Sequence, residues 1–196
     1  MAEQISKWDQ LSSETAQVLF CDLQKEIVKH SKTTRPRSLA SAAKALLQLA
    51  QLFLLPTIIS VVPEGKNPPR MIDELADTGD LAPPMLRSSA SLFGDEATIA
   101  AIEKSGRKVL IIAGFMMEAV ALSTVLEALA HGYIVVVPVD ACGSPSSRTE
   151  GAVMRQMEAA GAITTSVVSV GAKLSPDFST EQGKQMFSIV QSIKID

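Results

Sequence analysis

The sequence predicts a three-layer α/β fold in which helices cover both faces of a parallel sheet. Short apolar runs rich in β-branched residues alternate along the chain with amphipathic helical patterns. Residues 108–114 and 133–140 are apolar almost throughout, as strands covered on both faces must be. Strands that alternate with helices form βαβ units, and right-handed crossovers leave few topologies. We therefore predict a six-stranded parallel sheet with the common order 3-2-1-4-5-6.

The first half of the chain is expected to supply three strands. The first covers residues 16–22, "AQVLFCD", and the second covers residues 57–62. A helix over residues 38–53 joins them, and it must end before the following proline. A short helix is expected over residues 69–77, where proline suits the first turn. A brief third strand over residues 85–87 follows.

The second half continues the alternation. A helix over residues 95–104, which Gly106 can end, precedes the fourth strand. A helix from residue 118 to 130 then leads to the fifth strand, with His131 and Gly132 closing that helix. The remaining expected elements are a helix over residues 149–160, a strand within residues 162–170 and a final helix that follows the capping box "STEQ", residues 179–182.

Length and composition indicate one globular domain. The chain has 196 residues, and we expect a single domain over 1–196 with a core at about 15–170 and a C-terminal helix at about 180–194. The formal net charge is −3 and no basic block is present, so we expect no nucleic-acid partner. These features favour a small-molecule ligand over a polymer.

Cysteine usage and hydropathy predict a cytoplasmic protein. Two cysteines, Cys21 and Cys142, are too few for a disulfide framework, and the N-terminus shows no apolar secretory segment. The most apolar stretch, residues 46–62, contains Gln48, Gln51 and Pro56, which argues against a membrane span. We therefore expect reduced thiols and no membrane partner.

The predicted strand order places a ligand site where the first and fourth strands end. In this order these strands are neighbours and the winding of the sheet reverses between them. Their carboxyl ends bring "CDLQ" beside "AGFMMEAV". Asp22 is costly to bury there unless it is hydrogen-bonded or functional. Two readings stay open: Asp22 takes part in chemistry, or it caps backbone N–H groups of a neighbouring loop.

Several common sites are excluded by missing motifs. The first strand is followed by no G-x-G-x-x-G, and the chain contains no P-loop and no G-x-S-x-G elbow. The spacings of His30, His131, Cys21 and Cys142 match no common metal site. We therefore predict no cofactor and no metal, and we expect His131 to cap a helix end.

Three motifs, in order, resemble those of the isochorismatase-like (cysteine hydrolase) superfamily. "LFCDLQ" resembles the first-strand motif of that family, "VLIIAGFMMEAVALSTVLEAL" its fourth strand and nucleophile helix, and "VVVPVDACGS" its fifth strand. The similarity covers about residues 15–170. It implies the Rossmann-like fold of these hydrolases, and commonly a homo-oligomer, either a dimer or a larger assembly.

The resemblance also implies a catalytic triad, which this chain matches only in part. Family members use a cysteine nucleophile, an aspartate that acts as general base and acid, and a lysine after the third strand. Asp22 matches the aspartate, Arg87 lies nearest to the lysine position, and Val120 occupies the cysteine position. The other pocket residues that the resemblance implies are Gln24, Phe93, Gly114, Met116, Met117, Glu118 and Ala119. A cis peptide between Met116 and Met117 is implied as well.

We interpret the chain as a relative of hydrolases that cleave amide or similar C–N bonds of small molecules, without the cysteine chemistry. The alternatives are a pseudoenzyme that binds a small anionic ligand through Asp22 and Arg87, a structural or partner-binding module, and a hydrolase in which Asp22 activates water. The helix over residues 118–130 is apolar around much of its circumference. Either the sheet alone or a second subunit could bury it.

Overall fold

The computed structural model describes residues 6–76 and 83–195 and contains one parallel sheet. Its strand order is β3-β2-β1-β4-β5-β6, which confirms the predicted order 3-2-1-4-5-6. The strands are β1 (Ala16–Cys21), β2 (Thr57–Val61), β3 (Met85–Leu86), β4 (Val109–Gly114), β5 (Ile134–Pro138) and β6 (Ile163–Thr165).

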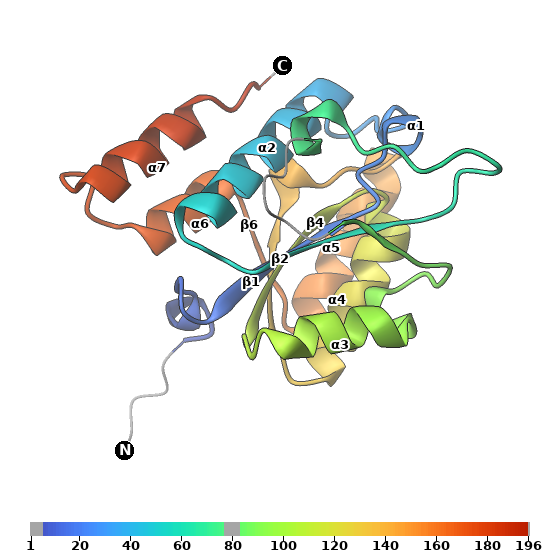
Figure 1. Cartoon of the computed structure of the whole chain (residues 1–196), viewed down its shortest axis with the longest axis horizontal. Coiled ribbons are helices and arrows are strands. Elements are labelled where there is room, and N and C mark those ends of the chain that lie inside the picture. The colour runs from blue at the N-terminus through green and yellow to red at the C-terminus, as the bar shows by residue number, and fades with distance from the viewer. Residues whose placement is uncertain (1–5, 77–82, 196) are drawn as a thin grey trace.

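Helices form a layer on each side of the sheet (Figure 1). One layer contains α2 (Pro36–Leu52), α6 (Val167–Leu174) and α7 (Glu181–Gln191), and the other contains α3 (Glu96–Lys104), α4 (Leu122–Ala130) and α5 (Ser147–Ala160). A single turn, α1 (Lys25–Val28), follows β1. Among the described residues no helix is both long and apolar enough to cross a membrane.

The two layers explain why the central strands are apolar throughout. Along β1, Val18 and Phe20 belong to the core beneath α2, whereas Leu19 and Cys21 belong to the core on the opposite face. Every residue of β1 and β4 is buried. Because each fully buried aliphatic or aromatic side chain contributes about 1.5–3 kcal/mol, these two strands are the most strongly held part of the fold.

Two helices were not predicted, the single turn α1 and the longer helix α6. The predicted sixth strand ends at Thr165, and α6 begins directly afterwards, with the Ser166 side chain accepting a hydrogen bond from the Ser169 N–H. The valines of "SVVSV" favour a strand by propensity. The serine cap and packing against α2 and α7 override that local preference.

Two further helix predictions need correction. The helix expected over residues 69–77 is only a 3₁₀ turn, Asp73–Leu75, and position 77 lies outside the described residues. The cap of α7 is Thr180 rather than Ser179, since the Thr180 hydroxyl accepts from the Gly183 N–H at 2.9 Å. The Ser179 hydroxyl instead donates to Asp177. The α7 face that packs inward contains Met186 and Val190.

Candidate functional site

The carboxyl ends of β1 and β4 lie side by side, as the sequence predicted. Cys21 pairs with Gly114 in the parallel register, and the Phe115 N–H donates to the Cys21 carbonyl at 3.1 Å. A Cβ on Gly114 would lie 2.2 Å from that carbonyl oxygen, so only glycine allows this approach. The Asp22 position and the residue 115–120 turn therefore share one edge of the sheet.

Asp22 takes a backbone conformation that aspartate tolerates better than most residues. Its φ angle is +55°, in the left-handed region, directly after β1 ends. The Asp22 N–H donates to the Ser60 carbonyl at 2.9 Å, which fixes the residue against β2. The side chain is thereby held at the crevice, where the residue is only 7% exposed.

Arg87 is the buried counter-ion of Asp22. Its Nη2 donates to Asp22 Oδ2 at 2.5 Å, and its Nε donates to the Ser60 hydroxyl at 2.8 Å. A third donor, Nη1, contacts the Ser89 carbonyl. With 3% of its surface exposed and three partners, the guanidinium is fixed in one orientation.

A cavity of 670 Å³ opens beside this ion pair. Three of the residues that the resemblance implied, Met116, Ala119 and Val120, line it together with Asp22 and Arg87. The other lining residues are Glu26, Ile27, His30, Val62, Ser88, Ser89, Ala90, Phe115 and Pro145. The cavity thus has a largely apolar wall that also carries the charged side chains of Asp22, Glu26 and Arg87.

The second oxygen of the Asp22 carboxylate is a hydrogen-bond acceptor that no described residue uses. Oδ1 is buried and has no hydrogen-bond partner among residues 6–76 and 83–195. Burial raises the pKa of Asp22 to about 6, although the charge of Arg87 and its hydrogen bond act in the opposite direction. Such a carboxyl group can accept a hydrogen bond or a proton near neutral pH.

Other residues that the resemblance implied lie outside the cavity wall. Gln24 donates to the Val62 carbonyl at 3.0 Å and accepts from the Val62 N–H at 2.8 Å, which holds the loop after β2. Phe93 stacks on His131, with ring centroids 4.9 Å apart. Met117 is fully buried in the core on the α4 side of the sheet. Glu118 accepts hydrogen bonds from Ser144 and Thr149.

The predicted position of the cis peptide was wrong by one residue. The cis bond joins Phe115 to Met116, and not Met116 to Met117.

Comparison with known proteins identifies the family. The model of the isochorismatase domain matches residues 16–169. The chain belongs to the isochorismatase family. A curated relative, the probable hydrolase YcaC of Escherichia coli K12, is 28% identical over 172 residues, which cover 86% of this chain and 81% of YcaC.

Solved isochorismatase-family structures share the whole fold. YcaC from Pseudomonas aeruginosa, in a structure with hexane-2,5-diol and covalent acrylamide, superposes with a TM-score of 0.87 at 29% identity, covering 93% of this chain and 91% of that one. YcaC from E. coli, an octameric hydrolase of unknown specificity, gives 0.86 at 27% identity, covering 93% and 90%.

Sequence reasoning missed several residues of this isochorismatase-family site. Ser60, whose hydroxyl accepts a hydrogen bond from Arg87, is the one polar residue within the run "IISVV", residues 58–62, and this exception could have marked it. Glu26 reaches the cavity from α1, and His30 and Pro145 reach it from loops, and the course of these segments depends on the folded structure. No local pattern in the sequence marks these three positions.

Neither native thiol is placed as a nucleophile. Cys21 and Cys142 are both fully buried, and burial raises the pKa of Cys142 to about 12 and that of Cys21 well above its usual range. Thiols in such surroundings are poorly reactive. Within the described part of the chain, no group of three His, Cys, Asp or Glu side chains could hold a metal ion.

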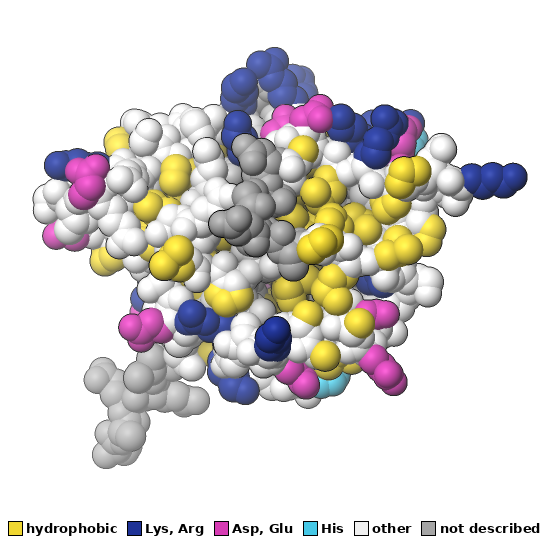
Figure 2. All heavy atoms as spheres, viewed as in Figure 1, with side chains coloured by type: hydrophobic (Ala, Val, Ile, Leu, Met, Phe, Trp, Pro, Cys, Tyr) yellow, Lys and Arg dark blue, Asp and Glu magenta, His cyan; other side chains and the backbone are white. Residues whose placement is uncertain are grey.

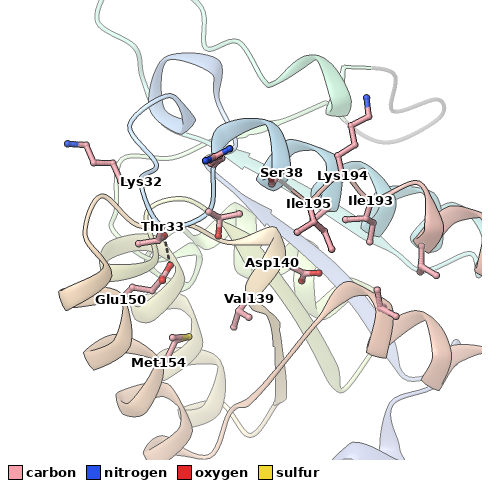
Figure 3. A pocket seen from close by; sticks show the side chains of 15 residues that line it. Lys32, Thr33, Ser38, Val139, Asp140, Glu150, Met154, Ile193, Lys194 and Ile195 are labelled. Carbon is pink, nitrogen blue, oxygen red and sulfur yellow. Dashed lines mark hydrogen bonds between the residues drawn. The ribbon is translucent and has the colours of Figure 1, made fainter.

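A second cavity, of 520 Å³, lies between α2, α5 and α7 (Figure 3). Asp140, which follows β5, lines it, and both oxygens of this carboxylate accept from the Val167 N–H at the start of α6, at 2.9 and 3.2 Å. Burial raises the pKa of Asp140. Thr33 and Glu150 face each other across a hydrogen bond of 2.6 Å on the opposite side of the cavity.

Proposed function

We propose that this isochorismatase-family protein binds a small, uncharged organic molecule in the Asp22–Arg87 cavity and lacks the cysteine chemistry of its relatives. The observation that carries the proposal is the unpartnered, buried Oδ1 of Asp22 at the wall of a 670 Å³ cavity. A buried acceptor without a partner gains free energy when a ligand donates a hydrogen bond to it.

The charges around the cavity favour a neutral ligand over an anion. Asp22 already neutralises Arg87, and Glu26, the second carboxylate of the cavity wall, is paired with Lys29. An anion would therefore meet two carboxylates whose cations, Arg87 and Lys29, are already paired. A hydroxyl or amide group could instead donate to Asp22, while its carbon skeleton contacts Ile27, Met116 and Val120.

The ligands of a relative have the same chemistry. The P. aeruginosa YcaC structure contains hexane-2,5-diol and covalent acrylamide, which are small and uncharged. The first carries hydroxyl groups and the second a primary amide. Both could donate to a carboxylate while an apolar wall holds the carbon atoms.

Loss of the cysteine chemistry follows from Val120. The family resemblance implies that the nucleophilic cysteine would fall at this position, and the support from the structure is that Val120 lines the cavity together with Asp22. A valine side chain can neither attack a carbonyl carbon nor carry a negative charge. Removing the nucleophile of a catalytic triad typically lowers turnover about a million-fold.

A second candidate is a hydrolase in which Asp22 activates water. The pKa of about 6 favours this candidate, because the carboxylate is mostly ionised at neutral pH and still basic enough to take a proton. Water held on Oδ1 would attack a substrate bound against Met116 and Val120. No covalent intermediate would form in this reaction.

Titration with hexane-2,5-diol tests the proposal. Chemical shifts of the wild-type protein should change at residues that line the Asp22–Arg87 cavity. Asp22→Asn, which suits the positive φ angle, should weaken binding by about tenfold or more, since a hydrogen bond to a charged acceptor contributes about 1.5–3 kcal/mol. The exposed carboxylate Asp73 supplies the control, and Asp73→Asn should bind as the wild type does.

The same titration separates the alternatives. Tighter binding of hexanoate than of hexane-2,5-diol would favour an anionic ligand. Hydrolysis of a panel of small amides that Asp22→Asn abolishes would favour the water-activating hydrolase. If saturating concentrations of the diol, of hexanoate and of the amides change no chemical shift at the cavity, a structural or partner-binding module becomes the best interpretation.

We also propose that the protein forms a homo-oligomer. The E. coli relative is an octamer. Hydrophobic side chains gather on the right-hand side of the face shown in Figure 2. Leu86, at the end of β3, is 59% exposed, and such a large apolar side chain is better buried against another subunit than left in water.

A further inference from the structure

Three of the segments that line the Asp22–Arg87 cavity, here called its three walls, meet at the loop of residues 142–146. They are the turn at residues 115–120, the 142–146 loop itself and the loop at residues 27–33. Gly143 lies between the other two. A Cβ there would approach Ser31 Oγ to 2.4 Å, Leu39 Cδ1 to 2.8 Å and Phe115 Cδ2 to 3.3 Å. The middle wall is therefore in close contact with both neighbours.

Backbone hydrogen bonds join the middle wall to residues 32 and 33. The Ser144 N–H donates to the Thr33 hydroxyl at 2.9 Å, and the Ser144 carbonyl accepts from the N–H groups of Lys32 and Thr33 at 2.9 and 3.2 Å. The Thr33 hydroxyl donates in turn to Glu150 Oε1 on α5, as Figure 3 shows. The 142–146 loop and the segment at residues 27–33 are thus fixed to each other and to α5.

Glu118 joins the third wall, the turn at residues 115–120, to Ser144 in the middle wall. Its Oε1 accepts from the hydroxyl of Ser144, which is fully buried, and from the Thr149 hydroxyl at 2.5 Å. The neighbouring Met117 N–H donates to the Gly143 carbonyl at 3.0 Å. One carboxylate oxygen therefore connects the turn that carries Ala119 and Val120 to the loop that carries Pro145.

The other oxygen of Glu118 argues against a role in stability alone. Oε2 is buried and, among the described residues, has no hydrogen-bond partner. An unsatisfied carboxylate oxygen costs free energy, so this arrangement holds the walls together at the expense of stability. Buried polar atoms without hydrogen-bond partners are expected at functional sites, where the shape of the site takes precedence over stability.

We propose that Glu118 is a positioning residue that sets the spacing of the three walls and so the shape of the Asp22–Arg87 cavity. This inference rests on the proposed function, in that a ligand occupies the cavity. Glu118 acts through Ser144 and Thr149 and does not touch the ligand. Its replacement should therefore change ligand affinity according to whether the new side chain can still accept the two hydroxyl donors.

Two substitutions at this position separate positioning from packing. Glu118→Met keeps the length of the side chain but removes the acceptor, and hexane-2,5-diol should bind about tenfold more weakly. Glu118→Gln keeps one acceptor oxygen and should bind within about threefold of the wild type. The matched control is Glu158→Met on the same helix as Thr149, because Glu158 accepts from Thr164 at 2.5 Å and does not line the cavity.

Thermal unfolding of each variant shows whether it is folded before its affinity is compared. Equal affinity in folded Glu118→Met and wild type would overturn the inference and leave the proposed function intact. Equal weakening in Glu118→Gln and Glu118→Met would overturn it as well, since the retained acceptor would then have no effect.

A thiol reporter tests the inference if the diol does not bind. In a Val120→Cys background, Ser144→Ala removes one donor to Glu118 without changing any charge. Glu118 then keeps only the Thr149 donor, and the resulting displacement of the turn that carries residue 120 should shift the pH midpoint of iodoacetamide alkylation by about 0.5. Thr164→Val, which removes the donor to Glu158, is the control. An unchanged midpoint would overturn the inference whatever ligand the cavity takes.

Discussion

Asp22 and Asp140 occupy equivalent places in the fold and have different environments. Each follows the carboxyl end of a buried strand, β1 or β5, and burial raises the pKa of both. Asp140 directs both oxygens to the N–H of Val167 and so caps α6. Asp22 gives one oxygen to Arg87 and leaves the other without a partner among the described residues.

The difference shows that the position at a strand end does not decide the role of a carboxylate. The Asp140 carboxylate meets a helix that begins nearby, and its hydrogen-bonding capacity is used inside the protein. The Asp22 carboxylate pairs with the guanidinium of Arg87, which comes from a distant segment of the chain. Asp22 also lines a cavity. The two readings open for Asp22 were a part in chemistry and the capping of backbone N–H groups. The capping position is held by Asp140, whereas Asp22 lines a cavity.

Removal of Arg87 should have the largest effect on stability. Arg87→Met would leave the Asp22 carboxyl group buried without its counter-ion, which typically costs about 3–5 kcal/mol in free energy of unfolding. Urea unfolding at neutral pH measures this change. Lys25→Met removes one partner of the exposed pair with Asp73 and should cost less than about 1 kcal/mol. Similar losses in the two variants would mean that Arg87 is not a buried counter-ion in solution.

The pH dependence of Asp22→Asn isolates the ionisation of this one group. The folded-state pKa of about 6 lies above the ordinary value of 3.8, so the protonated group favours the folded state. This contribution is complete below pH 4 and is lost as pH rises through 6. Relative to Asp22→Asn, the wild type should therefore lose up to about 3 kcal/mol in free energy of unfolding between these pH values.

Urea unfolding of both proteins at several pH values measures this difference. The neighbouring groups Glu26, His30 and Arg87 are present in both proteins, so their own titration largely cancels in the difference. A difference that stays constant from pH 4 to 7 would show that Asp22 titrates normally and that the cavity is well hydrated.

The sequence predicted the sheet and its order because those features depend on local pattern and chain connectivity. Apolar runs predicted the strands, and their alternation with helices predicted parallel connections. The strand order that we predicted on this basis is the one observed. The helix α6 was missed because "SVVSV" has the residue types of a strand, while its serine cap and its packing against α2 and α7 come from the folded structure.

The candidate site was predictable only where a motif determined it. Asp22, Arg87 and Val120 were named from the sequence, and the structure brings all three to one cavity. The direction of the Glu118 side chain was not predictable, since it depends on Ser144 and Thr149, which arrive from beyond the next strand. Sequence position shows which turn carries a residue, and tertiary contacts decide which side of that turn it faces.

Removal of the Asp140 carboxylate should have the smallest effect and should be confined to stability. Asp140→Ala takes away an acceptor for the first N–H of α6, and losses of this kind cost about 0.5–2 kcal/mol. Asp140→Asn keeps one acceptor oxygen and should recover part of that loss, which urea unfolding can resolve. Neither variant should change the affinity for hexane-2,5-diol, because Asp140 does not line the Asp22–Arg87 cavity. Weaker diol binding in Asp140→Asn would mean that the two strand ends are coupled, and the assignment of capping to one carboxylate and binding to the other would be wrong.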